Sequence, residues 1–138
     1  MEEKAPEKLF ICITKMNQKH AEMFANYFDK GIPIQAELKD ARRKHVLYYE
    51  DLVKRGIVWL AGSWKDHTGG MQIFAVNSLE EAKKAQRNDP FFISGTMYDD
   101  TYHEWQIHTP FNKVAPGLRE RVAQTLKECG IVPELSNS

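Results

Sequence analysis

One histidine, His45, occupies a position where it could take part in chemistry. It falls on the apolar stripe of a helical pattern over residues 35–55, with Arg42 one turn before it and Tyr49 one turn after it. An imidazole changes charge near neutral pH, so it can take up and release a proton as a general base or acid. On a buried helix face it also needs a hydrogen-bond partner. His45 is therefore either a proton-transfer group or a structural residue with a satisfied hydrogen bond.

Asp89 is the carboxylate that could act together with His45. It precedes Pro90, where a helix must end because proline has no N–H to donate and disfavours helical geometry in the residue before it. The ordinary function of an aspartate at such a place is to accept backbone hydrogen bonds in a turn. If the fold brings Asp89 beside His45, the carboxylate could instead fix the tautomer of an imidazole that acts as a general base. The spacing in the sequence does not decide between these functions.

Other side chains could line a pocket around such a pair. His103 alternates onto the same face of a strand pattern as Trp105. Large aromatic residues are first of all candidates for the hydrophobic core or a dimer interface, and only secondly for the lining of a pocket. The aromatic candidates are Trp59, Trp64, Phe91, Phe92 and Tyr98.

Motifs for other kinds of chemistry are missing from the sequence. It contains no phosphate-binding glycine loop, no nucleophile elbow and no paired-carboxylate signature. Cys12 and Cys129 are far apart and form neither a C-x-x-C motif nor a Cys/His ligand spacing. We therefore expect no metal site, no disulfide and no cofactor.

The composition limits the classes of partner. Nineteen Lys and Arg balance nineteen Asp and Glu in 138 residues, so the chain has no strong field to attract nucleic acid or an anionic membrane surface. No apolar run approaches the length of a membrane span, and the polar start MEEKAPEK lacks the apolar core of a signal peptide. We expect a cytoplasmic protein of one domain that binds neither nucleic acid nor a membrane.

The hydrophobic patterns predict an α+β fold. Strands are expected over residues 8–16, 57–64, 71–77 and 101–108, and helices over residues 17–30, 35–55, 79–88 and about 116–129. Their order is that of a ferredoxin-like unit, which is an antiparallel sheet with helices on one face. Relative to that unit, a helical segment is inserted at about 17–34 and a helix is added at about 116–129.

Three of the predicted strands are apolar on both faces. A single antiparallel sheet with helices on one face should alternate apolar with polar residues, because its second face meets water. The economical cover for that second face is the same sheet of a second copy, so we expect a symmetric homodimer.

The sequence resembles the YCII-related family in an ordered set of residues. The set is Arg42-x-x-His45, Gly56, Ala61-Gly62, Gly70, Ser78-x-x-Glu81-Ala82 and Asp89-Pro90-Phe91, within about residues 35–110. The resemblance implies a dimeric α+β barrel with a pocket that holds a His/Asp pair, here His45 and Asp89. Some similar proteins are dehydrochlorinases of chlorinated hydroxyquinols, the neighbouring muconolactone isomerases share the barrel, and most relatives have no established reaction. Two departures are the longer segment 17–34 and Ser63, where relatives commonly have proline.

These observations lead to one predicted function and one alternative. The prediction is a cofactor-independent, dehydrochlorinase-like lyase or isomerase for a small cyclic or aromatic-derived metabolite. In this enzyme His45 moves the proton, Asp89 orients and stabilises the imidazole of His45, and Arg42 holds an anionic oxygen of the substrate. The predicted substrate-binding residues are Arg42, Tyr49, Trp59, Trp64, Phe91 and His103. The alternative is a non-catalytic small-ligand-binding or protein-interaction module with a structural His–Asp hydrogen bond.

Overall fold

The structure is a computed structural model that describes residues 8–106 and 127–130. The chain divides into two units, Met1–Gln106 and Ile107–Ser138. In the second unit, the end of a helix at residues 127–128 is followed by Gly130 with a φ of 74°. The rest of the helix predicted for 116–129 lies outside the described residues, and a single domain over the entire chain stays a prediction.

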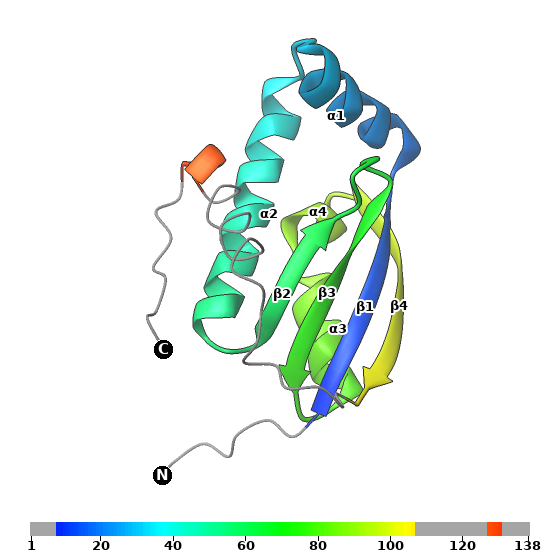
Figure 1. The fold of residues 1–138 in the computed structure, drawn as a ribbon, viewed down its shortest axis with the longest axis vertical. Helices are drawn as coiled ribbons and strands as arrows, with labels where there is room; N and C mark the ends of the chain where they lie inside the picture. Colours follow the sequence, from blue (N-terminus) through cyan, green and yellow to red (C-terminus); the bar gives the residue numbers. More distant parts are fainter. Residues whose placement is uncertain (1–7, 107–126, 131–138) are drawn as a thin grey trace. The chain divides into compact units, whose positions relative to one another are not determined.

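The first unit is built on a four-stranded antiparallel sheet (Figure 1). Its strands are β1 (Lys8–Met16), β2 (Val58–Ser63), β3 (Gly69–Val76) and β4 (Met97–Trp105). They lie in the order β2-β3-β1-β4, with antiparallel pairing between all neighbours. This is the strand order of a ferredoxin-like unit, so the predicted α+β fold with an antiparallel sheet is confirmed.

Four helices accompany the sheet. They are α1 (Gln18–Lys30), α2 (Ala36–Lys54), α3 (Leu79–Arg87) and α4 (Pro90–Ile93). Side-chain caps fix three of the starts. Asn17 accepts the backbone N–H of His20 at α1, Ser78 accepts that of Glu81 at α3, and Asp89 accepts that of Phe91 at α4. Gly31 ends α1 in the left-handed conformation that glycine adopts without strain. No helix in the described part of the chain is long and apolar enough to cross a membrane.

The strand faces can be assigned from their pairing. Phe10, Cys12 and Thr14 of β1 are buried and point toward the helices, whereas Ile11 and Ile13 point to the opposite face and are half buried. Residues directly opposite each other on antiparallel strands share a face. The helix-facing set therefore continues into β3 through Phe74, Gln72 and Gly70, which pair with Phe10, Cys12 and Thr14 in that order.

Two hydrophobic clusters lie between the sheet and the helices. The Phe74 cluster joins α2 and α3 to the sheet, and its buried members are Phe10, Cys12, Tyr49, Leu52, Val58, Phe74, Val76 and Ala82. The Phe24 cluster joins α1 and α4 to the other end of α2, and its buried members are Phe24, Leu38, Phe91 and Met97, with Met16, Met23, Ile34 and Ala41 packed around them. Helix α1, in the predicted inserted segment, thus contributes Phe24 to the core.

The structure differs from the predicted elements in three places. Strand β4 begins at Met97 rather than residue 101, and Asp99 and Asp100 lie opposite the single residue Thr14 in a β-bulge. Strand β3 begins at Gly69 instead of residue 71. The short helix α4 was not predicted, because four residues are too few to show helical periodicity.

Candidate functional site

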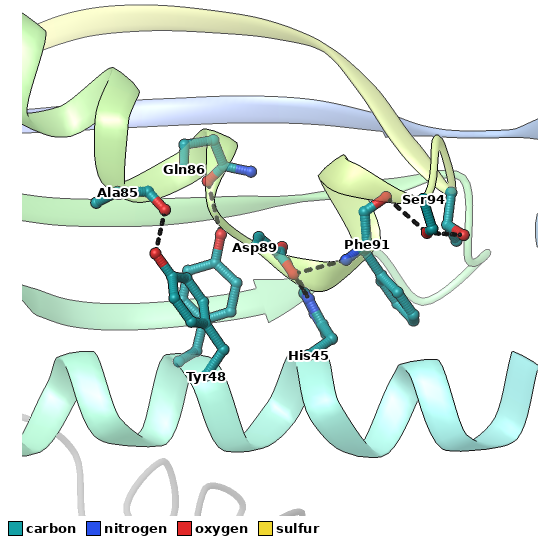
Figure 2. Close-up of polar contacts among 9 residues, drawn as sticks. His45, Tyr48, Ala85, Gln86, Asp89, Phe91 and Ser94 are labelled. Carbon is teal, nitrogen blue, oxygen red and sulfur yellow. Dashed lines mark hydrogen bonds and ion pairs between the residues drawn. The ribbon is translucent and has the colours of Figure 1, made fainter.

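His45 and Asp89 meet in the structure (Figure 2). Nδ1 of His45 lies 2.8 Å from Oδ1 and 2.9 Å from Oδ2 of the Asp89 carboxylate. The two residues are 44 positions apart in the sequence and come from α2 and from the junction of α3 with α4. With a carboxylate as acceptor, the imidazole carries its proton on Nδ1 and leaves Nε2 with a lone pair.

Two aromatic rings fix the orientation of the imidazole. Phe91 stacks on His45 with ring centroids 4.2 Å apart and planes 11° apart. Tyr49, one turn further along α2, packs edge-on against His45, with the two ring centroids 5.1 Å apart. The His45 side chain retains 20% of its exposure, so the ring is held firmly but still reaches solvent on one side.

Asp89 is held by the start of α4. Its backbone is extended, and Oδ1 accepts the N–H of Phe91 at 2.9 Å, which caps the helix. The side chain is completely buried. Because a buried carboxylate is costly unless it is paired and hydrogen-bonded, the imidazole and this N–H both compensate its burial.

Two tyrosines tie α2 to α3 beside the pair. Tyr49 donates its hydroxyl to Oε1 of Gln86 at 2.7 Å, and Tyr48 donates to the carbonyl of Ala85 (Figure 2 shows the Tyr48 bond). Burial, and secondly the charge of Asp89, raise the pKa of Tyr49 well above its ordinary value. Tyr49 is therefore neutral and positions its neighbours as a hydrogen-bond donor.

Arg42 of α2 packs against α1, in the inserted segment. Its guanidinium carbon is 4.7 Å from the ring centroid of Phe28 in α1. Phe28 stacks in turn on His67 of the β2–β3 turn, with centroids 5.4 Å apart. The predicted contact between Arg42 and a substrate anion stays a prediction.

The other predicted binding residues are spread over the sheet. Trp59 is half buried in β2, where the register shifts between Val58 and Leu60, and Trp64 is 41% exposed just beyond that strand. His103 is exposed on β4 opposite Ile11, on the face turned away from α2. The structure therefore brings Tyr49 and Phe91 to the pair but does not bring His103 there.

The thiol of Cys12 does not add a nucleophile. Cys12 is completely buried, and this burial raises the pKa of its thiol to about 12. It is therefore protonated at neutral pH, whereas the thiolate is the reactive form. Within residues 8–106 and 127–130, no group of three or more His, Cys, Asp or Glu side chains could hold a metal ion.

Four buried polar residues were missed by the sequence analysis, and one of them, Thr96, is 1% exposed. Thr14, Gln72 and Gln86 are 1%, 3% and 0% exposed. Thr14 and Gln72 stand among apolar neighbours on their strands, and that is a signal the sequence contains, whereas Gln86 stands among the charged residues of α3 and gives no such signal. A polar residue on the core-facing side of a predicted strand or helix needs a partner inside the protein.

Comparisons with known proteins agree with this description. The family model of the YCII-related domain matches residues 9–106, a range that contains both His45 and Asp89. Among solved structures, the chain is similar to 5-chloro-2-hydroxyhydroquinone dehydrochlorinase (TftG) from Burkholderia phenoliruptrix AC1100, in complex with 2,5-dihydroxybenzoquinone. The identity is 18% over 72% of this chain and 95% of that chain, with a TM-score of 0.49. No curated protein matches the sequence.

Proposed function

The chain belongs to the YCII-related family, and from this premise we propose that it is a cofactor-independent enzyme that moves a proton on a small molecule. The reaction is of the lyase or isomerase type, and the substrate is a small cyclic or aromatic-derived metabolite. His45 is the general base, and Asp89 is the carboxylate that positions it.

One observation carries this proposal. Both oxygens of a completely buried carboxylate lie within 2.9 Å of Nδ1 of His45, while the imidazole retains one-fifth of its exposure. Within the described residues, Nε2 has no hydrogen-bond partner, so its lone pair can reach a substrate. A carboxylate on Nδ1 fixes this tautomer and stabilises the imidazolium that forms when Nε2 takes a proton.

The proposed steps need only the side chains of the chain itself. Nε2 of His45 removes a proton from a substrate carbon or hydroxyl, and the released electron pair forms a new double bond. In a lyase reaction, a leaving group departs from the neighbouring atom with its bonding pair. In an isomerase reaction, the imidazolium returns the proton to a different atom. In both cases Asp89 remains ionised beside the positive ring.

The alternative function uses the same contacts. The Asp89 carboxylate also caps α4, and Phe91 of that helix stacks on His45, so the pair joins α2 to α4 without any chemistry. On this alternative the protein binds a small ligand or another protein, and the His–Asp bond is purely structural.

The deciding experiment compares His45→Asn with His67→Asn. The side chains of His45 and His67 are 20% and 19% exposed, which makes His67 a matched control outside the pair. Phenols, quinols, lactones and small carboxylates are screened for thermal stabilisation of the wild type, and turnover is measured for the compounds that bind. We expect His45→Asn to lose about 100-fold or more in rate with a nearly unchanged melting temperature.

Two results would contradict the enzyme. A loss of less than about tenfold in rate in His45→Asn is too small for a general base. A clear fall in melting temperature with ligand binding retained would favour the structural alternative. His67→Asn should keep the rate of the wild type in either case.

A further inference from the structure

Three polar atoms in the interior lack a hydrogen-bond partner within the described part of the chain. They are Oγ1 of Thr14, Oε1 of Gln72 and Nε2 of Gln86. Figure 2 shows the amide nitrogen of Gln86 directed away from the tyrosine hydroxyl that its oxygen binds. Because buried polar groups in native proteins are nearly always hydrogen-bonded, three such atoms in one small unit call for an explanation.

The three residues belong to β1, β3 and α3, and Gln86 is joined to the His45–Asp89 pair through Tyr49, which binds its side chain and packs against His45. Along β1, Thr14 stands between Cys12 of the Phe74 cluster and Met16 beside the Phe24 cluster. Along α2, His45 stands between Tyr49 of the first cluster and Ala41 beside the second. The step from Thr14 to either neighbour on β1 is two strand residues, about 6.6 Å, and the step from His45 to either neighbour on α2 is one helical turn, about 5.4 Å. The two residues are therefore at similar distances along their elements from the two clusters.

Polar residues also lie next to members of the two apolar clusters on α3 and β3. Gln86 and Asp89 follow Ala82 of the Phe74 cluster and precede Phe91 of the Phe24 cluster. Gln72 pairs with Cys12 and is therefore a diagonal neighbour of Thr14 on the helix-facing side of the sheet. We call Thr14, Gln72, Gln86 and the His45–Asp89 pair the polar band, because all of them lie beside members of the two apolar clusters.

The side chains next to this band on β2 are small. Gln72 pairs with Ala61, and Gly70, opposite Thr14, pairs with Ser63. Ala61 and Ser63 are exposed, whereas Thr14, Gln72 and Gly70 are buried. On the helix-facing side, this part of β2 therefore presents only the small side chains of Ala61 and Ser63 beside the buried residues.

We propose that Thr14, Gln72 and Gln86 bind and orient the substrate of the His45–Asp89 pair, and that this substrate is an uncharged molecule with a hydroxyl and a carbonyl group. This inference rests on the function proposed above. The amide nitrogen of Gln86 donates to the carbonyl, and Oε1 of Gln72 accepts from the hydroxyl. Thr14 can donate or accept.

The charge of the ligand follows from the composition of the band. The buried polar residues of the described chain include no Lys or Arg, and the only acidic residue among them is Asp89. A phosphate or carboxylate placed here would face a like charge in a low dielectric, with only the imidazole to offset it. An uncharged ligand meets no such cost.

The experiment uses changes that remove the polar atoms of a side chain and largely keep its shape. Thr14→Val and Gln72→Met are compared with Gln18→Met, an exposed glutamine of α1. The probes are 2-hydroxycyclohexanone, its single-group analogues cyclohexanone and cyclohexanol, and the anion cyclohexanecarboxylate. Melting temperatures are measured without ligand, and dissociation constants are measured by calorimetry.

We expect both interior variants to melt at or above the wild-type temperature, because an unpartnered buried atom costs stability. We also expect them to bind 2-hydroxycyclohexanone about fivefold more weakly or worse, since a lost hydrogen bond is worth about 1–3 kcal/mol when its partner stays buried. For the wild type, cyclohexanone and cyclohexanol should bind more weakly than the hydroxyketone, and cyclohexanecarboxylate should bind least. The control Gln18→Met should bind 2-hydroxycyclohexanone as tightly as the wild type does.

Several results would overturn the inference. Lower melting temperatures would mean that the atoms already have partners, such as ordered water, in the free protein. Equal affinity in the wild type and both variants, or no affinity of the wild type for the hydroxyketone, would mean that they do not bind substrate. The proposed function fails differently, through a His45→Asn variant that keeps its turnover.

Discussion

Asp89 is the residue on which the most interactions of the site converge. Its carboxylate pairs with the imidazole of His45, caps α4 and lies buried beside Tyr49, whose pKa it helps to raise. Asp89 thus has a structural function and a proposed chemical function. Only a substitution that keeps one and removes the other can separate the two. Asparagine does so, because its amide oxygen caps a helix as well as a carboxylate does but carries no charge.

We therefore predict different outcomes for Asp89→Asn and Asp89→Ala. Asp89→Asn should lower turnover about 100-fold or more, since a neutral amide no longer stabilises the imidazolium, while the α4 cap persists. Asp89→Ala should in addition lower the free energy of unfolding by about 1–2 kcal/mol through the lost cap. Urea denaturation and turnover of a screened substrate measure the two effects. Equal turnover in Asp89→Asn and the wild type would contradict the role of the carboxylate.

At this scale the sequence predicted the pair and its neighbours Tyr49 and Phe91, but not the place of Arg42 or the part of Gln86. His45 was identified by its place on a helical stripe, and Asp89 was matched to it through the family resemblance, since spacing alone could not show that they meet. Arg42 could not be located, because the position of Phe28 depends on how the inserted segment packs. Gln86 was missed because its partner Tyr49 lies on a different helix.

The β2–β3 hairpin contains two positions, Gly69 and Gly70, where the packing leaves no room for a side chain. A Cβ added to Gly69 would clash with the backbone carbonyl of Thr14, and one added to Gly70 would clash with that of Gly62. A Cβ on Gly62 itself would meet nothing within 4 Å. Close approach of three strand backbones, and not the turn alone, therefore explains why two glycines begin β3.

We predict that Gly69→Ala and Gly70→Ala each lower the free energy of unfolding by about 1–3 kcal/mol, as overpacking of a rigid backbone does. Gly62→Ala, the matched control, should change it by less than about 1 kcal/mol. Urea denaturation of the three variants checks this order. If Gly62→Ala proved the most destabilising of the three, the hairpin would be packed differently from the structure.

The elements themselves were predicted where the pattern is periodic and missed where it is interrupted. Strand β1 and helix α2 were found nearly to the residue, because their apolar positions recur with a single period. The start of β4 was missed because Asp99 and Asp100 form a bulge, and Asp99 has a φ of 57°. A bulge depends on the neighbouring strand, so the residues of one strand do not reveal it.

For the whole molecule, the question is what lies against the second face of the sheet. On this face Ile73 is buried and Leu9, Ile11, Ile13 and Met71 are half buried, while Leu60 and Trp105 are 38% and 40% exposed. A soluble protein seldom presents a row of large apolar side chains to water unless the row binds something. We propose, as the strand patterns already suggested, that a second copy of the chain, related by a two-fold axis, packs against this face of the sheet.

This proposal predicts that the protein sediments with twice the 16.0 kDa mass of the chain. In a two-fold interface a change on the central strand appears twice and near the axis, so Ile11→Lys should bury two like charges and shift the protein to a monomer. Ile93→Lys is the matched control, because Ile93 is 72% exposed at the end of α4, on the helix side of the sheet. Analytical ultracentrifugation of the wild type and both variants is the measurement. A monomeric wild type would refute the dimer, and a dimer that survives Ile11→Lys but not Ile93→Lys would move its interface to the helices.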